Sequence, residues 1–187
     1  LKELAKGFKK AASEFGIEII GGDTISNEKL DISVTIISKV SNPIYRKGMN
    51  KGDILCYTGT LGLCKIYLER LFKNKEVPKK SKFIKPILNA DFFYEIAPLI
   101  TTSMDISDGL FFELERLSKA NKLGFEFFHK IDEEIGTSGE EYEILFSFNE
   151  NNLEKIKKIA LKHKVKLNPF AKAVKGKYTT DCKNHHF

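Results

Sequence analysis

The 187-residue chain contains no tryptophan, only three cysteines, and no apolar run of the length that a membrane-spanning helix needs. No basic segment followed by an apolar stretch and a small-residue cleavage site is recognisable either. The odd number of cysteines, without CxxC spacing, favours reduced thiols over a disulfide framework. We therefore expect a cytoplasmic protein that is not embedded in a membrane, with free thiols at Cys56, Cys64 and Cys182.

Arginine is also scarce, although the chain carries a formal net charge of +6 and has a pI near 9.1. It occurs only at Arg46, Arg70 and Arg116. Forked contacts to phosphates and bases favour arginine, so a positive charge made mostly of lysine weakens a nucleic-acid-binding hypothesis. The lysines are dispersed and mixed with glutamate, as in 73–82 and 155–166, which indicates a solvated surface. A non-catalytic nucleic-acid-binding protein stays open as an alternative of another class.

The first 45 residues predict a helix followed by two strands. Apolar side chains recur on one helical face, and Gly16 predicts the end of this helix. Strands are expected at 17–20 and 30–37. Because the helical pattern is regular from Leu1, which is not methionine, we expect sequence upstream. The Ser-Asn-Pro at 41–43 and the Gly- and Lys-rich run at 46–53 predict a domain boundary near residue 45.

Residues 46–187 predict a second unit, in which strands and helices interleave without a regular βαβ repeat. Strands are expected at 54–58, 124–128, 142–148 and 165–174. Helices are expected at 63–72, 88–100, 110–121 and 153–163. A hydrophobic content of 42% suffices for a sizeable core. The chain as a whole therefore predicts an α+β fold.

An acidic loop at Met104-Asp105-Ile106-Ser107-Asp108-Gly109 runs directly into one of these helices. Carboxylates and a hydroxyl next to the free N–H groups of a helix start suit a site that holds magnesium against phosphate. A structural alternative is that Ser107 or Asp108 merely caps the helix, which leaves Asp105 unexplained. The spacing does not fit a calcium-binding loop.

A second acidic turn, Gly21-Gly22-Asp23-Thr24, permits two interpretations. Its glycines can let the backbone approach a phosphate while Asp23 binds the accompanying cation. Alternatively, the glycines permit positive φ and Asp23 bonds to its own backbone.

A third acidic cluster, Ser138-Gly139-Glu140-Glu141-Tyr142-Glu143, precedes an apolar strand. Its acids are either solvent-facing or, at Glu140, turned into a cleft to receive a cationic or hydroxyl-bearing substrate. Arg46 is either solvated or a fork donor to phosphate. A zinc site at the chain end is disfavoured, because the spacing of Cys182, His185 and His186 is wrong.

Five blocks, read in chain order, resemble the motifs of the thiamine-monophosphate kinase family. They are Gly21-Gly22-Asp23-Thr24, Arg46-x-Gly48-x-x-x-Gly52-Asp53, Tyr57-Thr58-Gly59-Thr60-Leu61-Gly62, Met104-Asp105-Ile106-Ser107-Asp108-Gly109-Leu110 and Ser138-Gly139-Glu140-Glu141-Tyr142-Glu143-Ile144. The resemblance covers nearly the whole chain. It implies magnesium-dependent transfer of the γ-phosphoryl group of ATP onto thiamine monophosphate, which gives thiamine diphosphate.

The resemblance also implies a two-domain fold like that of aminoimidazole ribonucleotide synthetase. Residues 1–45 would be the C-terminal portion of an ATP-binding N-terminal domain that forms a homodimer, and residues 46–187 a C-terminal α+β domain. The implied contacts to ATP are Gly22, Asp23, Arg46 and Ser107. The implied magnesium ligands are Asp23, Asp105 and Asp108. Glu140 would contact the thiamine substrate. No catalytic base or covalent nucleophile is assigned, because the acceptor phosphate is already anionic.

Several positions depart from the family pattern. Glu141 stands where aspartate is usual, and Ser138 where the first of two glycines is usual. The connection between His129 and Gly136 is shorter than usual. Asn184 takes the place of an aromatic ring over the substrate. The family's N-terminal part is absent from this sequence, so we expect the chain alone to be inactive. A selenophosphate synthetase-like enzyme is the alternative within the same superfamily.

Overall fold

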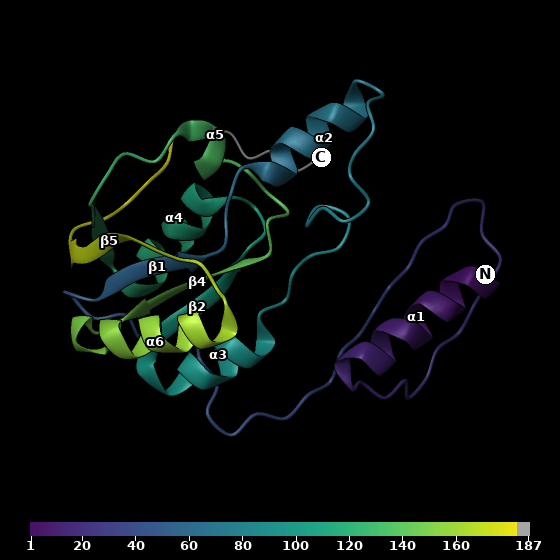
Figure 1. Cartoon of the computed structure of the whole chain (residues 1–187), viewed down its shortest axis with the longest axis horizontal. Helices are drawn as coiled ribbons and strands as arrows, with labels where there is room; N and C mark the ends of the chain where they lie inside the picture. Colours follow the sequence, from purple (N-terminus) through teal and green to yellow (C-terminus); the bar gives the residue numbers. More distant parts are fainter. Residues whose placement is uncertain (183–187) are drawn as a thin grey trace. The chain divides into compact units, whose positions relative to one another are not determined.

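The computed structural model describes residues 1–182 and divides the chain into two compact units, Leu1–Val40 and Ser41–Phe187. In the first unit, helix α1 spans Lys2–Phe15 (Figure 1). Gly16 ends it in the left-handed conformation, with φ of 62°, and its N–H donates to the carbonyl of Ala12. This is the glycine stop that the sequence predicts.

The remainder of the first unit differs from the prediction. In the described structure, residues 17–40 form neither of the two expected strands. A strand is stable only when a neighbouring strand satisfies its backbone N–H and C=O groups, and this unit offers no such neighbour among its described residues. The apolar face of α1 is likewise solvent-exposed, with Phe8 at 40% and Phe15 at 49% exposure.

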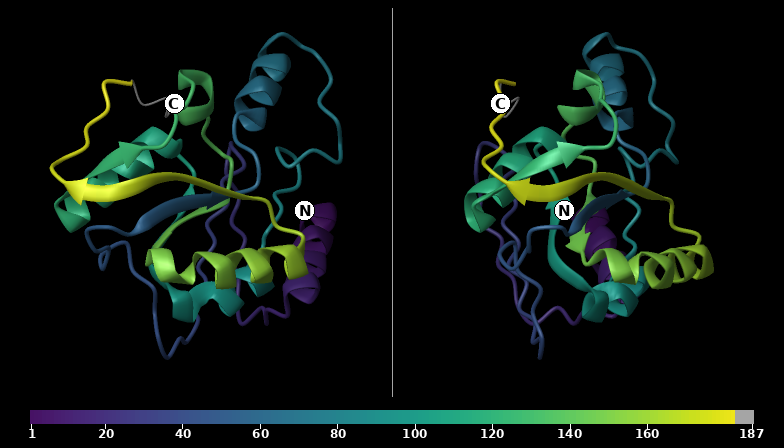
Figure 2. Two further views of the ribbon diagram at one scale, coloured as in Figure 1. Left: turned by 60° about the vertical axis from the view of Figure 1, so that its left-hand side comes forward. Right: turned by 90° about the vertical axis from the view of Figure 1, so that its left-hand side faces the viewer.

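The second unit is built on a five-stranded antiparallel sheet (Figure 2). Its strands run in the order β2-β4-β1-β5-β3. Their bounds are β1 Ile54–Thr58, β2 Ile100–Ile106, β3 Leu123–Phe127, β4 Glu143–Phe148 and β5 Leu167–Lys175. The central pair β1 and β4 is buried, which explains the near-continuous apolar run of each strand.

Helices cover both faces of this sheet (Figure 1). Helix α4, Leu110–Asn121, packs on one face through Leu110, Leu114 and Leu117. Helices α3, Ala90–Ile96, and α6, Leu153–His163, pack on the other through Phe92, Ile96 and Ile156. The remaining helices are α2 Leu63–Phe72, η1 Ala97–Leu99, α5 Glu133–Gly136 and η2 Glu150–Asn152. The predicted α+β fold is confirmed, and no helix of the described residues is long and apolar enough to cross a membrane.

In the second unit, one expected helix is wrong in its extent. The helix predicted at 88–100 is shorter, since α3 ends at Ile96 and gives way through a 3-10 turn that holds Pro98 to strand β2. Proline disfavours continuation of the helix, and residues 100–106 then alternate between buried and less buried positions. The acidic loop is therefore delivered by a strand rather than by a helix.

Candidate functional site

The acidic loop joins the end of β2 to the start of α4. Asp105 is the penultimate residue of the strand and is exposed, because its neighbours Met104 and Ile106 point into the core. The N-cap position of α4 falls on Gly109, not on Ser107 or Asp108, and it carries no side-chain cap bond. Gly109 has φ of 107°, and a Cβ there would lie 3.1 Å from the carbonyl oxygen of Gly136. Only glycine fits this turn without strain.

Charged side chains of α4, the helix that follows Asp108, hold this residue in place. Its carboxylate forms an ion pair with Arg116, and its backbone N–H donates to Glu113 Oε1 at 3.2 Å. Arg116 Nη1 also donates to both carboxylate oxygens of Glu113, at 2.9 and 3.0 Å. Burial raises the pKa of Glu113, and its bonds to Arg116 and to Asp108 oppose that shift. Asp108 thus sits in a mixed-charge network, and its side chain is only 8% exposed.

Two backbone hydrogen bonds join the acidic loop to the turn around Glu140. The N–H of Glu140 donates to the carbonyl of Ser107 at 2.7 Å, and that of Tyr142 to the carbonyl of Ile106 at 2.9 Å. Gly139 permits this approach, since a Cβ there would lie 2.9 Å from the Ser107 oxygen. The structure therefore brings together two acidic motifs that are distant in sequence.

Glu140 and Tyr142 face outward and bond to each other. The hydroxyl of Tyr142 donates to Glu140 Oε2 at 2.7 Å. This hydrogen bond, with smaller contributions from burial and from the charges of Glu140 and Asp105, raises the pKa of Tyr142 to about 12. Both residues have positive φ, 56° and 51°, which is uncommon outside glycine. The turn is therefore a strained conformation held by its surroundings.

The intervening acids, Glu141 and Glu143, point inward and are buried. Glu141 Oε1 accepts from the backbone N–H groups of Gly62 and Cys64 at 2.7 and 3.1 Å, at the start of α2, and from the hydroxyl of Ser138 at 2.6 Å. Glu143 Oε2 accepts from Thr58 Oγ1 at 2.7 Å. These carboxylates therefore hold the turn to α2 and β1.

Lys82 joins the two buried acids. Its ammonium lies 2.7 Å from Glu141 Oε2 and 2.7 Å from Glu143 Oε1, and it donates to the carbonyl of Thr60 at 2.8 Å. Its side chain is only 9% exposed. The expectation that lysines 73–82 form a solvated surface is thus wrong at Lys82. No local pattern distinguishes this lysine from its exposed neighbours Lys79 and Lys80.

Arg46 lies on the segment that leads into β1 and is exposed. Asn121, the last residue of α4, holds that segment. Its Oδ1 accepts from the N–H groups of Gly48 and Met49 at 2.9 and 3.0 Å, and its Nδ2 donates to the carbonyl of Arg46 at 2.8 Å. Sequence reasoning missed this contact, because an asparagine at a helix end is also common without any tertiary role.

The remaining predicted site residues lie outside the acidic loop, the Glu140 turn and the Arg46 segment. Gly22 and Asp23 lie in the first unit, where Asp23 Oδ1 accepts from the N–H of Thr24 at 2.7 Å. That bond fits the structural interpretation of this turn, but Gly21 and Gly22 do not have the positive φ that the same interpretation invokes. Asn184 lies outside the described residues, as do His185 and His186.

The oxygen donors of the acidic loop fit a magnesium ion in part. Magnesium in phosphoryl-transfer sites is usually held by one or two carboxylates, with substrate phosphates and water completing its shell. Asp105 and Asp108 could supply these carboxylates. Within residues 1–182 no group of three or more His, Cys, Asp or Glu side chains is placed to hold a metal. The acidic loop alone therefore does not supply a complete set of metal ligands.

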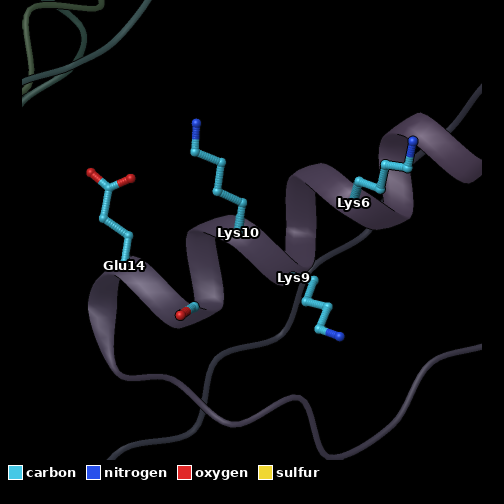
Figure 3. A pocket seen from close by; sticks show the side chains of 5 residues that line it. Lys6, Lys9, Lys10 and Glu14 are labelled. Atoms are coloured by element: carbon cyan, nitrogen blue, oxygen red, sulfur yellow. The ribbon is translucent and has the colours of Figure 1, made fainter.

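Among the surface hollows of the described residues are the following two. One, of about 350 Å³, is lined by Phe111, Lys130, Ile131, Asp132, Glu133, Asp181 and Cys182. The other, of about 470 Å³, lies along α1 and is lined by Lys6, Lys9, Lys10, Ser13 and Glu14. Figure 3 shows that Lys6, Lys10 and Glu14 extend from one side of this helix and Lys9 from another. Extended, separate side chains of this kind do not form an enclosed ligand site.

Comparisons with known proteins point to one class. The family model for the AIR synthase related protein, N-terminal domain, matches residues 1–40. The thiamine-monophosphate kinase of Nitrosopumilus maritimus is 31% identical over 179 residues, which cover 86% of this chain and 58% of the relative. That of Pyrococcus horikoshii is 30% identical over 172 residues, which cover 83% and 56%. The chain thus spans somewhat more than half the length of these curated relatives.

A solved structure described as AaThiL complexed with AMPPCP and TMP has the same fold, with a TM-score of 0.63 and 20% sequence identity. The match covers 75% of this chain and 53% of that one. At this sequence identity the likeness shows the fold alone, and the family model matches only residues 1–40. The chain is similar over most of its length to thiamine-monophosphate kinases. The resemblance that the five sequence motifs indicate is confirmed.

Proposed function

We propose that this chain provides part of a kinase that transfers the γ-phosphoryl group of ATP to thiamine monophosphate. The observation that carries the proposal is the pairing of the acidic loop with the Glu140 turn through the bonds to Ser107 and Ile106. It supports the proposal because it brings the carboxylates that we propose to bind magnesium close to the acid that we propose to face the substrate. The similarity to thiamine-monophosphate kinases supplies the reaction.

In this proposal, Asp105 and Asp108 hold magnesium, with Asp23 as a further ligand from the first unit. A bound magnesium ion would neutralise phosphate charge and orient the γ-phosphoryl group for in-line attack. Ser107 and Arg46 contact ATP, with Gly22 and Asp23. Arg46 suits this role because a guanidinium can bind two phosphate oxygens at once. Asn121 fixes the backbone from which Arg46 extends.

Glu140 contacts the thiamine part of the acceptor. For Asn184, which lies outside the described residues, a substrate contact stays a prediction from the sequence. The Tyr142 hydroxyl orients the Glu140 carboxylate and, since its pKa is raised to about 12, remains a hydrogen-bond donor at neutral pH. No residue is assigned as a base, because an anionic acceptor phosphate is already a competent nucleophile. The chain contributes charge placement and orientation.

Residues 1–45 would form the end of an ATP-binding N-terminal domain, and residues 46–187 the C-terminal domain. A homodimer through the N-terminal domain is supported by the exposed apolar side chains of the first unit, such as Phe8, Phe15 and Ile20. A cytoplasmic site of action accords with substrates that are soluble phosphates.

The test is turnover with a panel of acceptors. The polypeptide is produced as its gene encodes it, with whatever sequence precedes Leu1, and ADP is followed with ATP and magnesium. We expect turnover with thiamine monophosphate and none with thiamine or inorganic phosphate. Turnover with selenide or another acceptor in place of thiamine monophosphate would overturn the proposal. A basic nucleic-acid-binding protein would instead show salt-dependent retention of DNA or RNA and no turnover.

A further inference from the structure

The segment Glu140 to Glu143 alternates between outward and inward side chains. Glu140 and Tyr142 are exposed and bond to each other, whereas Glu141 and Glu143 are buried. The conformation of the outward pair therefore depends on what holds the inward pair. One ammonium group, that of Lys82, contacts both inward carboxylates.

We propose that Lys82 is a positioning residue, which fixes Glu140 for substrate binding by clamping Glu141 and Glu143 from the inner side of the turn. The proposal rests on the proposed function for the role of Glu140. The clamp itself is a property of this chain and can be tested without the reaction.

The negative charges of Glu141 and Glu143 explain why a cation is needed between these two side chains. Two carboxylates two residues apart repel each other strongly when buried, unless a cation lies between them. Glu141 is further stabilised by the start of helix α2, and Glu143 by the hydroxyl of Thr58. Although burial opposes it, hydrogen bonding to Glu141 and Glu143 raises the pKa of Lys82. The ammonium therefore stays charged at neutral pH.

The place of Lys82 in the chain adds a second consequence. It lies in the connection between α2 and α3, which contains no helix or strand among its described residues. Its three short contacts reach Glu141, Glu143 and the carbonyl of Thr60. The same lysine thus anchors this connection to the inner side of the turn. Without it, the strained backbone at Glu140 and Tyr142 loses one of its constraints.

Amide hydrogen exchange tests the clamp directly on this chain. The variants are Lys82→Met, the conservative Lys82→Arg, and the control Lys80→Met at an exposed lysine of the same connection. We expect the amides of Glu140 and Tyr142, which bond to Ser107 and Ile106, to exchange about tenfold faster in Lys82→Met. The amide of Phe146 in β4 reports on global opening and should change much less. Lys82→Arg should restore protection, and Lys80→Met should have no effect.

Unchanged exchange at Glu140 and Tyr142 in Lys82→Met would overturn the proposal. So would an equal acceleration at Phe146, since Lys82 would then support only global stability. If Lys82→Met does not fold, Lys82→Met/Glu143→Gln removes the repulsion and is compared with Glu143→Gln alone. The proposal then requires faster exchange at Glu140 and Tyr142 in the double variant, and equal exchange in both would overturn it.

Steady-state kinetics of the polypeptide, produced as its gene encodes it, provide a second test. Lys82→Met should raise the KM for thiamine monophosphate at least about tenfold, while the KM for ATP changes little. A uniform fall in kcat with both KM values unchanged would contradict a role in positioning Glu140. If no variant and no wild-type protein turns over thiamine monophosphate, the proposed function fails, and the exchange experiment still decides the clamp.

Discussion

The side-chain amide of Asn121 donates to the main-chain carbonyl of Arg46 at 2.8 Å and so ties the end of α4 to the segment before β1. Because α4 begins at the acidic loop, one rigid helix links that loop to the arginine proposed to bind ATP. This relationship explains how Arg46, at an exposed position, can have a defined place relative to Ser107 and Asp108.

Replacement of Asn121 by leucine should release the Arg46 segment. The change removes four hydrogen bonds, to Gly48, Met49, Arg46 and Leu117. We expect the free energy of unfolding to fall by about 2–3 kcal/mol, measured by urea denaturation. Lys119→Leu, at an exposed position of α4, is the matched control and should cost less than about 1 kcal/mol. Equal losses in both variants would mean that the contact contributes no stability.

Asp108→Asn should lower turnover strongly and the free energy of unfolding only slightly. The ion pair with Arg116 is weakened. The Asp108 side chain is only 8% exposed, but Arg116 is 42% exposed and keeps its bonds to Glu113, so the free energy of unfolding should fall by about 1–2 kcal/mol. Turnover in the polypeptide as encoded should nevertheless fall by about 100-fold, because a proposed magnesium ligand is lost. Glu126→Gln, at an exposed position of β3, serves as the control. Retention of full turnover by Asp108→Asn would remove Asp108 from the metal site.

Gly139→Ala should disrupt the contact between the acidic loop and the turn around Glu140. A Cβ at this position would lie 2.9 Å from the carbonyl oxygen of Ser107, and backbone atoms cannot yield as a flexible side chain can. We expect a loss of about 1–3 kcal/mol in the free energy of unfolding and faster exchange of the Glu140 amide. Gly7→Ala has nothing within 4 Å of the added methyl group and should be tolerated. Full stability of Gly139→Ala would show that the close approach is not required.

The thiols predict a pattern of chemical modification. Burial raises the pKa of Cys56 to about 12, and burial with the nearby Glu141 charge raises that of Cys64 to about 12. At pH 8 both should resist iodoacetamide in the native protein, whereas the partly exposed Cys182 should react; peptide mass spectrometry distinguishes them. Modification of Cys56 or Cys64 before Cys182 would contradict the burial described.

The same shifts predict a loss of stability in alkali. As the pH rises through the ordinary thiol value of 9.0, the unfolded chain releases the protons that Cys56 and Cys64 keep in the folded state. The unfolded state then binds fewer protons, so the free energy of unfolding falls. Cys56→Ala should show a shallower decline above pH 9 than the wild type, measured by urea denaturation at each pH. An equal slope would mean that Cys56 titrates normally in the folded protein.

Much of the second unit could be predicted from the sequence, because its signals are local. The bounds of β1, α2, α4 and α6 follow from apolar periodicity and nearby turn residues. Strand β2 was not predicted, because the expected helix was extended to residue 100 and the acidic loop was taken to follow it, although Pro98 and the alternation after it carried the correct signal. The strands expected at 17–20 and 30–37 were wrong, because strand formation depends on partners that a local pattern does not reveal.

The motifs of the candidate site could be predicted from the sequence, but the contacts that hold these motifs in place could not. Asp105, Asp108 and Glu140 stand out as acids beside turns, and the structure joins their motifs by backbone bonds. The contacts of Lys82 and Asn121 depend on which distant segments meet in space. A lysine among lysines and an asparagine at a helix end give no signal of that kind in a single sequence.

The most direct test of the central claim is the fate of the γ-phosphoryl group. The polypeptide as encoded is incubated with ATP labelled with ³²P at the γ position, thiamine monophosphate and magnesium, and thiamine diphosphate and ADP are quantified. We predict labelled thiamine diphosphate in equal amount to ADP, with both abolished by EDTA and restored by added magnesium. ADP released without labelled thiamine diphosphate, or label transferred to another acceptor, would contradict the account.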